Sequence, residues 1–170
     1  SRLNDPALAG GATLDMGIYS LSYCCYLLGE IPVRSNSMCT FNSAGVDDLA
    51  CYQLGFPSGA MAQIATGFKL WMDSRAVIYG TKGAVFFDGF SSGDRFTLRS
   101  HNGGNEIVTT EEMALEHQEN GFVYQVEEVV SCLDQGKSES SLIPLQETRD
   151  IMALMDSIRY SWDLRYEGEK

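Results

Sequence analysis

The chain has 170 residues, of which 44% are hydrophobic and 21% charged, and its formal net charge is −11 at pH 7. This length suffices for one domain with its own core, and no apolar run approaches the roughly 20 residues of a transmembrane helix. Phosphate groups repel so acidic a protein, and its 12 lysines and arginines are scattered, which argues against nucleic acid and anionic membranes as partners.

The first ten residues have no periodic pattern, and the first predicted helix covers residues 13–28. Its apolar positions recur at steps of four and three residues, the period of one buried helical face: Leu14, Ile18, Leu21, Cys25 and Leu28. Gly29 is expected to end this helix, and Pro32 lies beyond it.

The middle of the chain predicts six or seven strands. Alternating residues place strands at 33–41, 48–56, 60–68, 75–80, 84–89, 95–100 and 106–110. The segment "PSG" (57–59) and the segment "GTKG" (80–83) are expected to be turns, the second within a hairpin.

Two further helices end the chain. Five apolar residues share one face of the first of these helices, which Gly136 is expected to end: Phe122, Val126, Val129, Val130 and Leu133. The second begins at Pro144 and continues to about Trp162. The order predicts an α+β fold, namely a two-layer sandwich with a largely antiparallel open sheet and helices on one face.

The stretch "GGATLDMGIY" (10–19) offers a candidate site. Asp15 and Tyr19 are four residues apart and therefore lie on the same helical face. A phenol near an anion can polarise a hydroxyl or a carbonyl group. The same stripe, continued by Ser22 and Tyr26, is also typical of a solvated face, and the spacing alone favours that interpretation.

Other short patterns point away from bound groups. Gly10 and Gly11 do not form the G-x-G-x-x-G fingerprint that follows a strand in dinucleotide-binding domains. His101 and His117 have no ligand-like spacing with each other or with a cysteine pair, so no metal is expected. The five cysteines lack C-x-x-C spacing and predict free thiols in a reducing cytoplasm.

The segment "GGATLDMGIYSLSYCCYLLGEIP" (10–32) resembles the G-G-x-x-x-D-x-G-x-[HY] segment of the glucose–fructose oxidoreductase, inositol dehydrogenase and MocA (Gfo/Idh/MocA) family. Residues 78–90 and the two last predicted helices are similar to later parts of the same domain, so the resemblance runs from about Arg2 to Trp162. The tyrosine is shared with the dimeric dihydrodiol dehydrogenases, the branch that the chain resembles most.

The resemblance implies the C-terminal domain of an NAD(P)-dependent oxidoreductase that acts on a hydroxyl of a sugar, polyol or trans-dihydrodiol. Its fold would resemble the C-terminal domain of glyceraldehyde-3-phosphate dehydrogenase-like oxidoreductases. In this family an N-terminal Rossmann domain binds NAD or NADP and carries a catalytic lysine. Residues 1–170 are therefore expected to form one truncated domain without that Rossmann domain and without the family's first strand. Alone it should neither bind cofactor nor turn over substrate.

Position by position, Asp15 matches the family's active-site acid, and Tyr19 matches the residue that hydrogen-bonds the reacting hydroxyl. Gly10, Gly11 and Gly17 match close-packing glycines, the first two of them near the cofactor side. The family's sheet commonly pairs subunits through its open face, which implies a homodimer. The alternative is a non-catalytic dimerising or regulatory module of the same fold.

Overall fold

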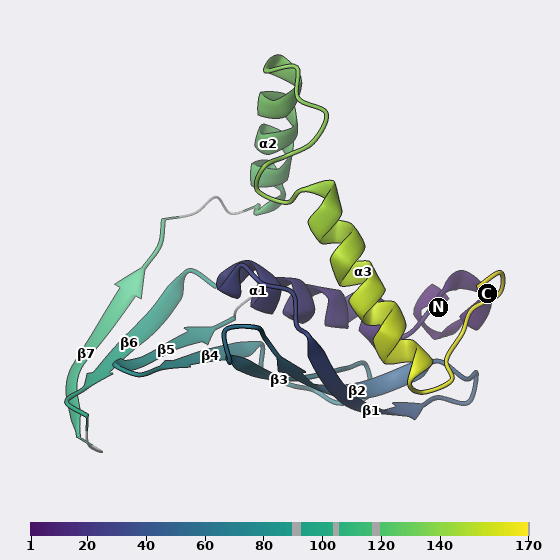
Figure 1. Cartoon of the computed structure of the whole chain (residues 1–170), viewed down its shortest axis with the longest axis horizontal. Coiled ribbons are helices and arrows are strands. Elements are labelled where there is room, and N and C mark those ends of the chain that lie inside the picture. The colour runs from purple at the N-terminus through teal and green to yellow at the C-terminus, as the bar shows by residue number, and fades with distance from the viewer. Residues whose placement is uncertain (90–92, 104–105, 117–119, 170) are drawn as a thin grey trace. The chain divides into compact units, whose positions relative to one another are not determined.

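The structure is a computed structural model that describes residues 1–89, 93–103, 106–116 and 120–169. It begins with two short 3₁₀ helices (Arg2–Asn4 and Pro6–Leu8) and a π-helix (Thr13–Gly17). The other elements, in chain order, are α1 (Ile18–Leu28), β1 (Arg34–Phe41), β2 (Asp47–Gly55), β3 (Met61–Gly67), β4 (Arg75–Gly80), β5 (Gly83–Asp88), β6 (Arg95–His101), β7 (Ile107–Ala114), α2 (Phe122–Asp134) and α3 (Leu145–Tyr160) (Figure 1). The predicted order of helix, strands and two helices is confirmed.

The chain divides into two compact units. The first unit contains residues 1–71 and 141–170, and the second unit contains residues 72–140. The first unit holds the three-stranded sheet β1-β2-β3, and the second holds the four-stranded sheet β4-β5-β6-β7. All pairings are antiparallel, so the predicted α+β class with antiparallel strands is confirmed.

The described strands form two antiparallel sheets in place of a single open sheet. Among the described residues β3 pairs with β2 and β4 pairs with β5, while residues 68–74 separate β3 from β4 along the chain. Each of the two strands thus pairs with one neighbour within its own unit and lies at the edge of its sheet.

The core of the first unit lies between its sheet and the helices α1 and α3. On β2 the buried side chains Ala50, Tyr52 and Leu54 alternate with exposed ones, as the period of two requires. The helices contribute the residues that their periodicity predicts, including Leu21 and Met155, which are fully buried. Figure 1 shows both helices over the same face of this sheet, as predicted.

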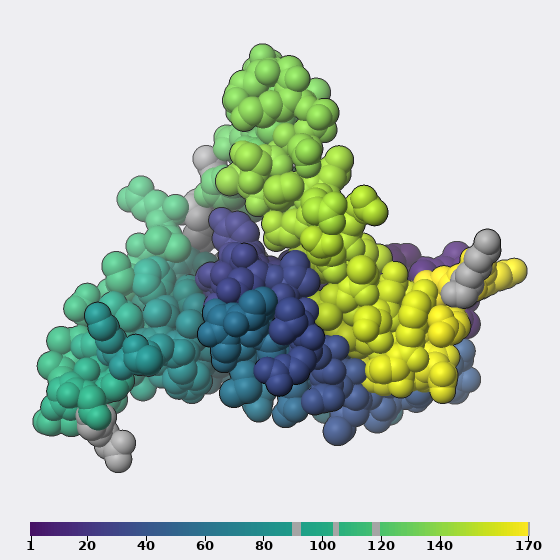
Figure 2. All heavy atoms as spheres, viewed as in Figure 1, coloured from purple at the N-terminus to yellow at the C-terminus, as the bar shows by residue number. Residues whose placement is uncertain are grey.

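The two ends of the chain meet within the first unit. The hydroxyl of Tyr166 donates to the backbone oxygen of Gly10, and Figures 1 and 2 show the purple and yellow ends side by side. The buried guanidinium of Arg159 lies 4.6 Å from the ring centre of Tyr166. It donates to Asp156 at 2.5 Å and to Glu169 at 2.8 and 3.2 Å, which ties the C-terminal segment to α3.

Aromatic side chains pack against each other within the sheet of the second unit. The rings of Phe87 and Phe96 stack across β5 and β6 with centres 5.6 Å apart. The hairpin turn predicted at 80–83 is confirmed, because Gly80 pairs with Gly83. In α2, by contrast, the predicted apolar face is exposed, with Phe122 at 70% and Leu133 at 69% of their surface, and Cys132 is its buried residue.

Acid is expected to destabilise the protein through Glu169. The hydrogen bonds from Arg159 lower the pKa of Glu169 below its ordinary value of 4.5. Its folded form therefore binds fewer protons than its unfolded form, so its contribution is present above that value and is lost as the pH falls through the lowered pKa. Glu169→Gln should flatten the fall of the unfolding free energy below about pH 4.5, measured by urea denaturation at a series of pH values.

Glu167→Gln is the matched control, because Glu167 is an exposed carboxyl two residues away. It should leave the acid dependence as in the parent protein. An acid dependence equally steep in Glu169→Gln and in Glu167→Gln would contradict the assignment to Glu169.

Candidate functional site

The helix predicted from residue 13 begins as the π-helix Thr13–Gly17 and continues directly as α1. Asp15 lies in the middle of the π-helix, and Tyr19 lies in the first turn of α1 with 66% of its surface exposed. Single π-helical turns are rare within helices and occur frequently at functional sites. The structure thus places Asp15 within this irregular turn and Tyr19 two residues after its end.

Asp15 and Tyr19 are close in the chain without pairing with each other among the described contacts. The partner of Asp15 is Arg2, whose Nη2 donates to Asp15 Oδ1 at 3.2 Å. Because 30% of the Asp15 side chain is exposed, this ion pair is partly screened by water. The carboxylate is therefore oriented from the N-terminal segment, while the Tyr19 phenol is open to a ligand.

A network of buried, hydrogen-bonded polar side chains lies beneath the π-helix and was not predicted from the sequence. The backbone N–H and the hydroxyl of Thr13 both donate to Asp47 Oδ2, at 2.7 and 2.6 Å. Since the Thr13 proton is used there, the Tyr52 hydroxyl donates to Thr13 Oγ1 at 2.8 Å. Burial raises the pKa of Tyr52, which keeps this donor protonated. The available signal was the pair of aspartates that opens the apolar strand β2.

The glycines that the resemblance singles out pack tightly around these hydrogen-bonded side chains. Gly11 has a φ of +126°, and a Cβ added there would lie 2.2 Å from Asp47 Oδ1. A Cβ on Gly17 would lie 2.9 Å from the Tyr52 hydroxyl. Gly10 and Gly11 are both buried, and Gly10 accepts the hydroxyl of Tyr166. Their placement near a cofactor stays a prediction.

No metal centre is found in the part of the chain that the structure describes: no three His, Cys, Asp or Glu residues gather closely enough to hold an ion. His101 Nδ1 accepts the backbone N–H of Gly103 at 3.0 Å, so one of its ring nitrogens serves the loop. His117 lies outside the described residues. Among the described helices, none is both long and apolar enough to cross a bilayer.

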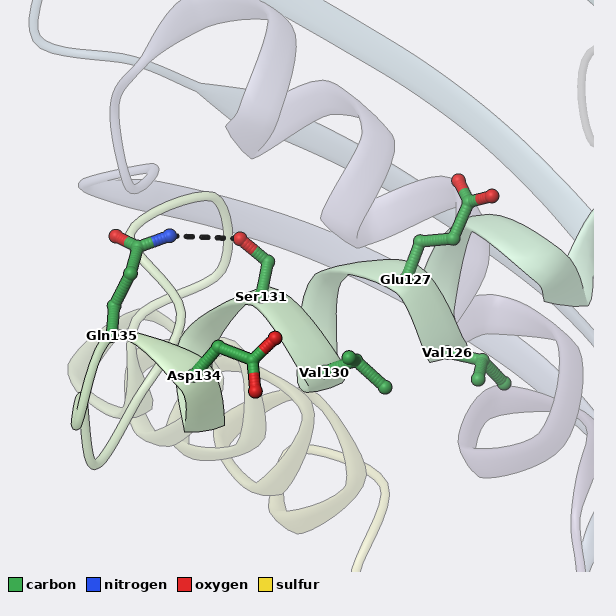
Figure 3. Close-up of a pocket in the computed structure, with 6 residues that line it drawn as sticks. All are labelled: Val126, Glu127, Val130, Ser131, Asp134 and Gln135. Carbon is green, nitrogen blue, oxygen red and sulfur yellow. Dashed lines mark hydrogen bonds between the residues drawn. The ribbon is translucent and has the colours of Figure 1, made fainter.

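Two surface depressions lie in the second unit. The larger, of about 480 Å³, is lined by residues of α2 and the residue that follows it, where Gln135 Nε2 donates to Ser131 Oγ at 2.8 Å (Figure 3). The smaller, of about 240 Å³, lies on the sheet and includes Tyr79 and Arg99. Neither is lined by Asp15 or Tyr19, which belong to the first unit.

Comparison with known proteins gives one family match. The model of the GFO/IDH/MocA C-terminal domain matches residues 1–86, just over half of the chain. The trans-1,2-dihydrobenzene-1,2-diol dehydrogenase of Bos taurus is 26% identical over 179 residues, which cover 99% of this chain and 51% of the bovine enzyme. The chain thus spans about half the length of the curated relatives that it matches.

Solved structures share the fold. The aldose-aldose oxidoreductase from Caulobacter crescentus, complexed with glycerol, matches with a TM-score of 0.76 and 28% identity over 94% of this chain and 48% of that one. The transcriptional regulator Gal80p from Kluyveromyces lactis matches with a TM-score of 0.72 over 94% of this chain and 46% of its own. Its identity of 15% makes this a likeness of fold alone.

Proposed function

The chain belongs to the GFO/IDH/MocA family as a C-terminal domain, and on that premise we propose that it is the substrate-binding and oligomerisation domain of an NAD(P)-dependent oxidoreductase. The observation that carries this proposal is the presentation of Asp15 and Tyr19 by the π-helix and the first turn of α1. The substrate class is a hydroxyl of a sugar, polyol or trans-dihydrodiol. The names of the bovine and Caulobacter relatives support that class.

Tyr19 is the group that would contact the reacting hydroxyl. Its exposed phenol can form a hydrogen bond to that hydroxyl and take part in moving its proton. Asp15, oriented by Arg2, would place a negative charge one turn before the phenol. When bound, the nicotinamide supplies the hydride acceptor. Since residues 10–17 lack the dinucleotide-binding fingerprint, we assign cofactor binding to a Rossmann domain outside this chain.

Calorimetric titration with NAD and NADP tests this division of roles. The full-length protein should bind one of the two cofactors, and residues 1–170 alone should bind neither. Micromolar affinity of residues 1–170 would contradict the assignment of the cofactor to another domain. A folded full-length protein that binds neither cofactor would contradict the oxidoreductase itself.

A non-catalytic dimerising or regulatory module is the second candidate. The specific observation in its favour is the shared fold of Gal80p, which is described as a transcriptional regulator. The fold therefore does not by itself imply turnover, and the decision rests on Tyr19 and Asp15. Under this alternative, substitution of Tyr19 would change no reaction rate.

We further propose that two copies pair through the uncovered face of the sheet β1-β2-β3. Met38, Cys51 and Ala65 are neighbours across the three strands and point away from the helices. Met38 is 73% exposed, and Met61, the first residue of β3 and on the same face, is 86% exposed. Apart from Arg34 at one end, the residues of this face carry no charge, which fits a two-fold contact that buries the same patch on both copies.

Sedimentation equilibrium over a range of protein and salt concentrations checks the pairing. A dimer should form and should tighten with salt, because two copies of charge −11 repel each other. Met38→Glu should weaken it, whereas Leu8→Glu, which adds the same charge at a residue of the N-terminal segment that is 59% exposed, should not. A species of 18.7 kDa at high concentration and moderate salt would contradict the proposal.

A reducing compartment, the cytoplasm, is proposed for the protein. All five cysteines are free thiols. Burial raises the pKa of Cys25 and of Cys39 to about 11, so these thiols stay protonated as core residues at neutral pH.

A further inference from the structure

Two residues of β2, Asp47 and Tyr52, support the π-helix at both of its ends. We infer that they are positioning residues, which fix the π-helical register and thereby the relative placement of Asp15 and Tyr19. This inference rests on the proposed function, because it concerns how the proposed catalytic groups are held. Neither residue lies on the exposed surface that Tyr19 occupies, since both are buried to 1% exposure or less.

The first end of the π-helix is held by Asp47. The N–H groups of a first helical turn have no partner within the helix, and negative charge is favourable there. Asp47 Oδ2 accepts both the backbone N–H and the hydroxyl of Thr13, at 2.7 and 2.6 Å. A carboxylate from a strand 34 residues further along the chain thus caps this helix.

The last residue of the π-helix rests on Tyr52. A Cβ on Gly17 would lie 2.9 Å from the Tyr52 hydroxyl, so only glycine allows the backbone to approach this closely. The same hydroxyl donates to Thr13 Oγ1 at 2.8 Å. One phenol therefore touches both the first and the last residue of the turn, and Asp15 is held between two fixed points.

Stability alone does not account for this arrangement. Asp47 is fully buried, and its Oδ1 has no hydrogen-bond partner among the described residues. Burying a carboxylate with an unsatisfied oxygen costs folding free energy. Proteins with apolar residues in place of buried charged groups are often no less stable. Irregular backbone of this kind persists only where its surroundings over-determine it.

The π-helical register changes the geometry of the site. The N–H of Ile18 reaches the carbonyl of Thr13, five residues back, where an α-helix would use four. The wider π-helical turn alters how Asp15 and Tyr19 are rotated relative to each other about the helix axis. If the support from Asp47 and Tyr52 is lost, the segment can relax to the α-helical register, which changes the rotation of Asp15 relative to Tyr19.

Amide hydrogen exchange and steady-state kinetics of the full-length protein test this inference together. Thr13→Val removes the hydroxyl from the chain of hydrogen bonds, and Tyr52→Phe removes the phenol oxygen while keeping the ring that stacks on Trp162. Both should raise the exchange rates of the amides of residues 13–18 and lower kcat roughly 10-fold, with KM little changed, because small misplacements of catalytic groups slow the reaction itself. Thr13→Ser, which keeps the hydroxyl, should restore both readouts.

Thr40→Val is the matched control. The Thr40 hydroxyl also donates to a β2 aspartate, Asp48, at 2.6 Å, but it does not touch the π-helix. This variant should leave both the exchange at residues 13–18 and kcat unchanged. Unchanged exchange in both Thr13→Val and Tyr52→Phe would overturn the inference, and so would faster exchange with an unaltered kcat. A wild-type protein without turnover would count against the proposed function, while the exchange measurement would still decide whether the clamp exists.

Discussion

Gly11→Ala is expected to destabilise the first unit by about 2–6 kcal/mol. Gly11 has a φ of +126°, a backbone conformation that side chains rarely adopt, and strain of that kind costs about 1–3 kcal/mol. The new Cβ would also lie 2.2 Å from Asp47 Oδ1, and the collision with a buried side chain adds about 1–3 kcal/mol. Urea denaturation, monitored by circular dichroism, measures the loss of unfolding free energy.

Gly45→Ala separates the two contributions. Gly45 has a φ of +89°, and a Cβ added there would meet nothing within 4 Å, so this variant carries backbone strain without the collision. It should cost about 1–3 kcal/mol, less than Gly11→Ala. Equal losses of unfolding free energy in the two variants would show that Asp47 does not contact Gly11. Such a result would contradict the support of the π-helix by Asp47.

Tyr19→Phe should reduce the turnover of the full-length enzyme about 100-fold, the typical contribution of a group that takes part in proton transfer. The fold should be retained, because 66% of the surface of Tyr19 is exposed and only its hydroxyl is removed. If the hydrogen bond strengthens in the transition state, kcat and kcat/KM should fall together. Steady-state kinetics with the best substrate provide the measurement.

Tyr26→Phe is the control for that substitution. Tyr26 lies seven residues later on the same stripe of α1 and is 61% exposed. Its loss should change kcat by no more than about twofold, as expected for a surface position. If Tyr19→Phe and Tyr26→Phe both had the turnover rate of the parent protein, Tyr19 would be an ordinary residue of a solvated helix face.

Local patterns predicted the regular elements, because a helix or strand must bury one face at its own period. The α3 positions Ile151, Met155 and Ile158 are buried as their spacing required. The end of β7 was harder to predict. The pattern predicted a strand only to residue 110, whereas β7 continues to Ala114 through the exposed residues Glu111 and Glu112 and lies at the edge of its sheet. Because edge strands tolerate charged residues, their composition does not distinguish them from exposed loops.

The candidate site was predicted only in part. The sequence motif placed Asp15 and Tyr19 near a helix start, and that is where they lie. The π-helix and its support depend on Asp47, which is distant from Thr13 in the chain and meets it only after β2 has packed against the helix. No local propensity encodes such a contact. The division into two sheets likewise depends on strand pairing in the folded chain, which local propensity does not encode.

Turnover of the full-length protein tests the proposed oxidoreductase most directly. The protein would be incubated with NAD or NADP and a panel of trans-dihydrodiols, sugars and polyols, while reduced cofactor and carbonyl product are both quantified. The proposal predicts that at least one substrate yields the two products in equal amounts, and that Tyr19→Phe suppresses both. A folded protein that binds cofactor yet forms neither product with any of these substrates would contradict it and would favour the non-catalytic module.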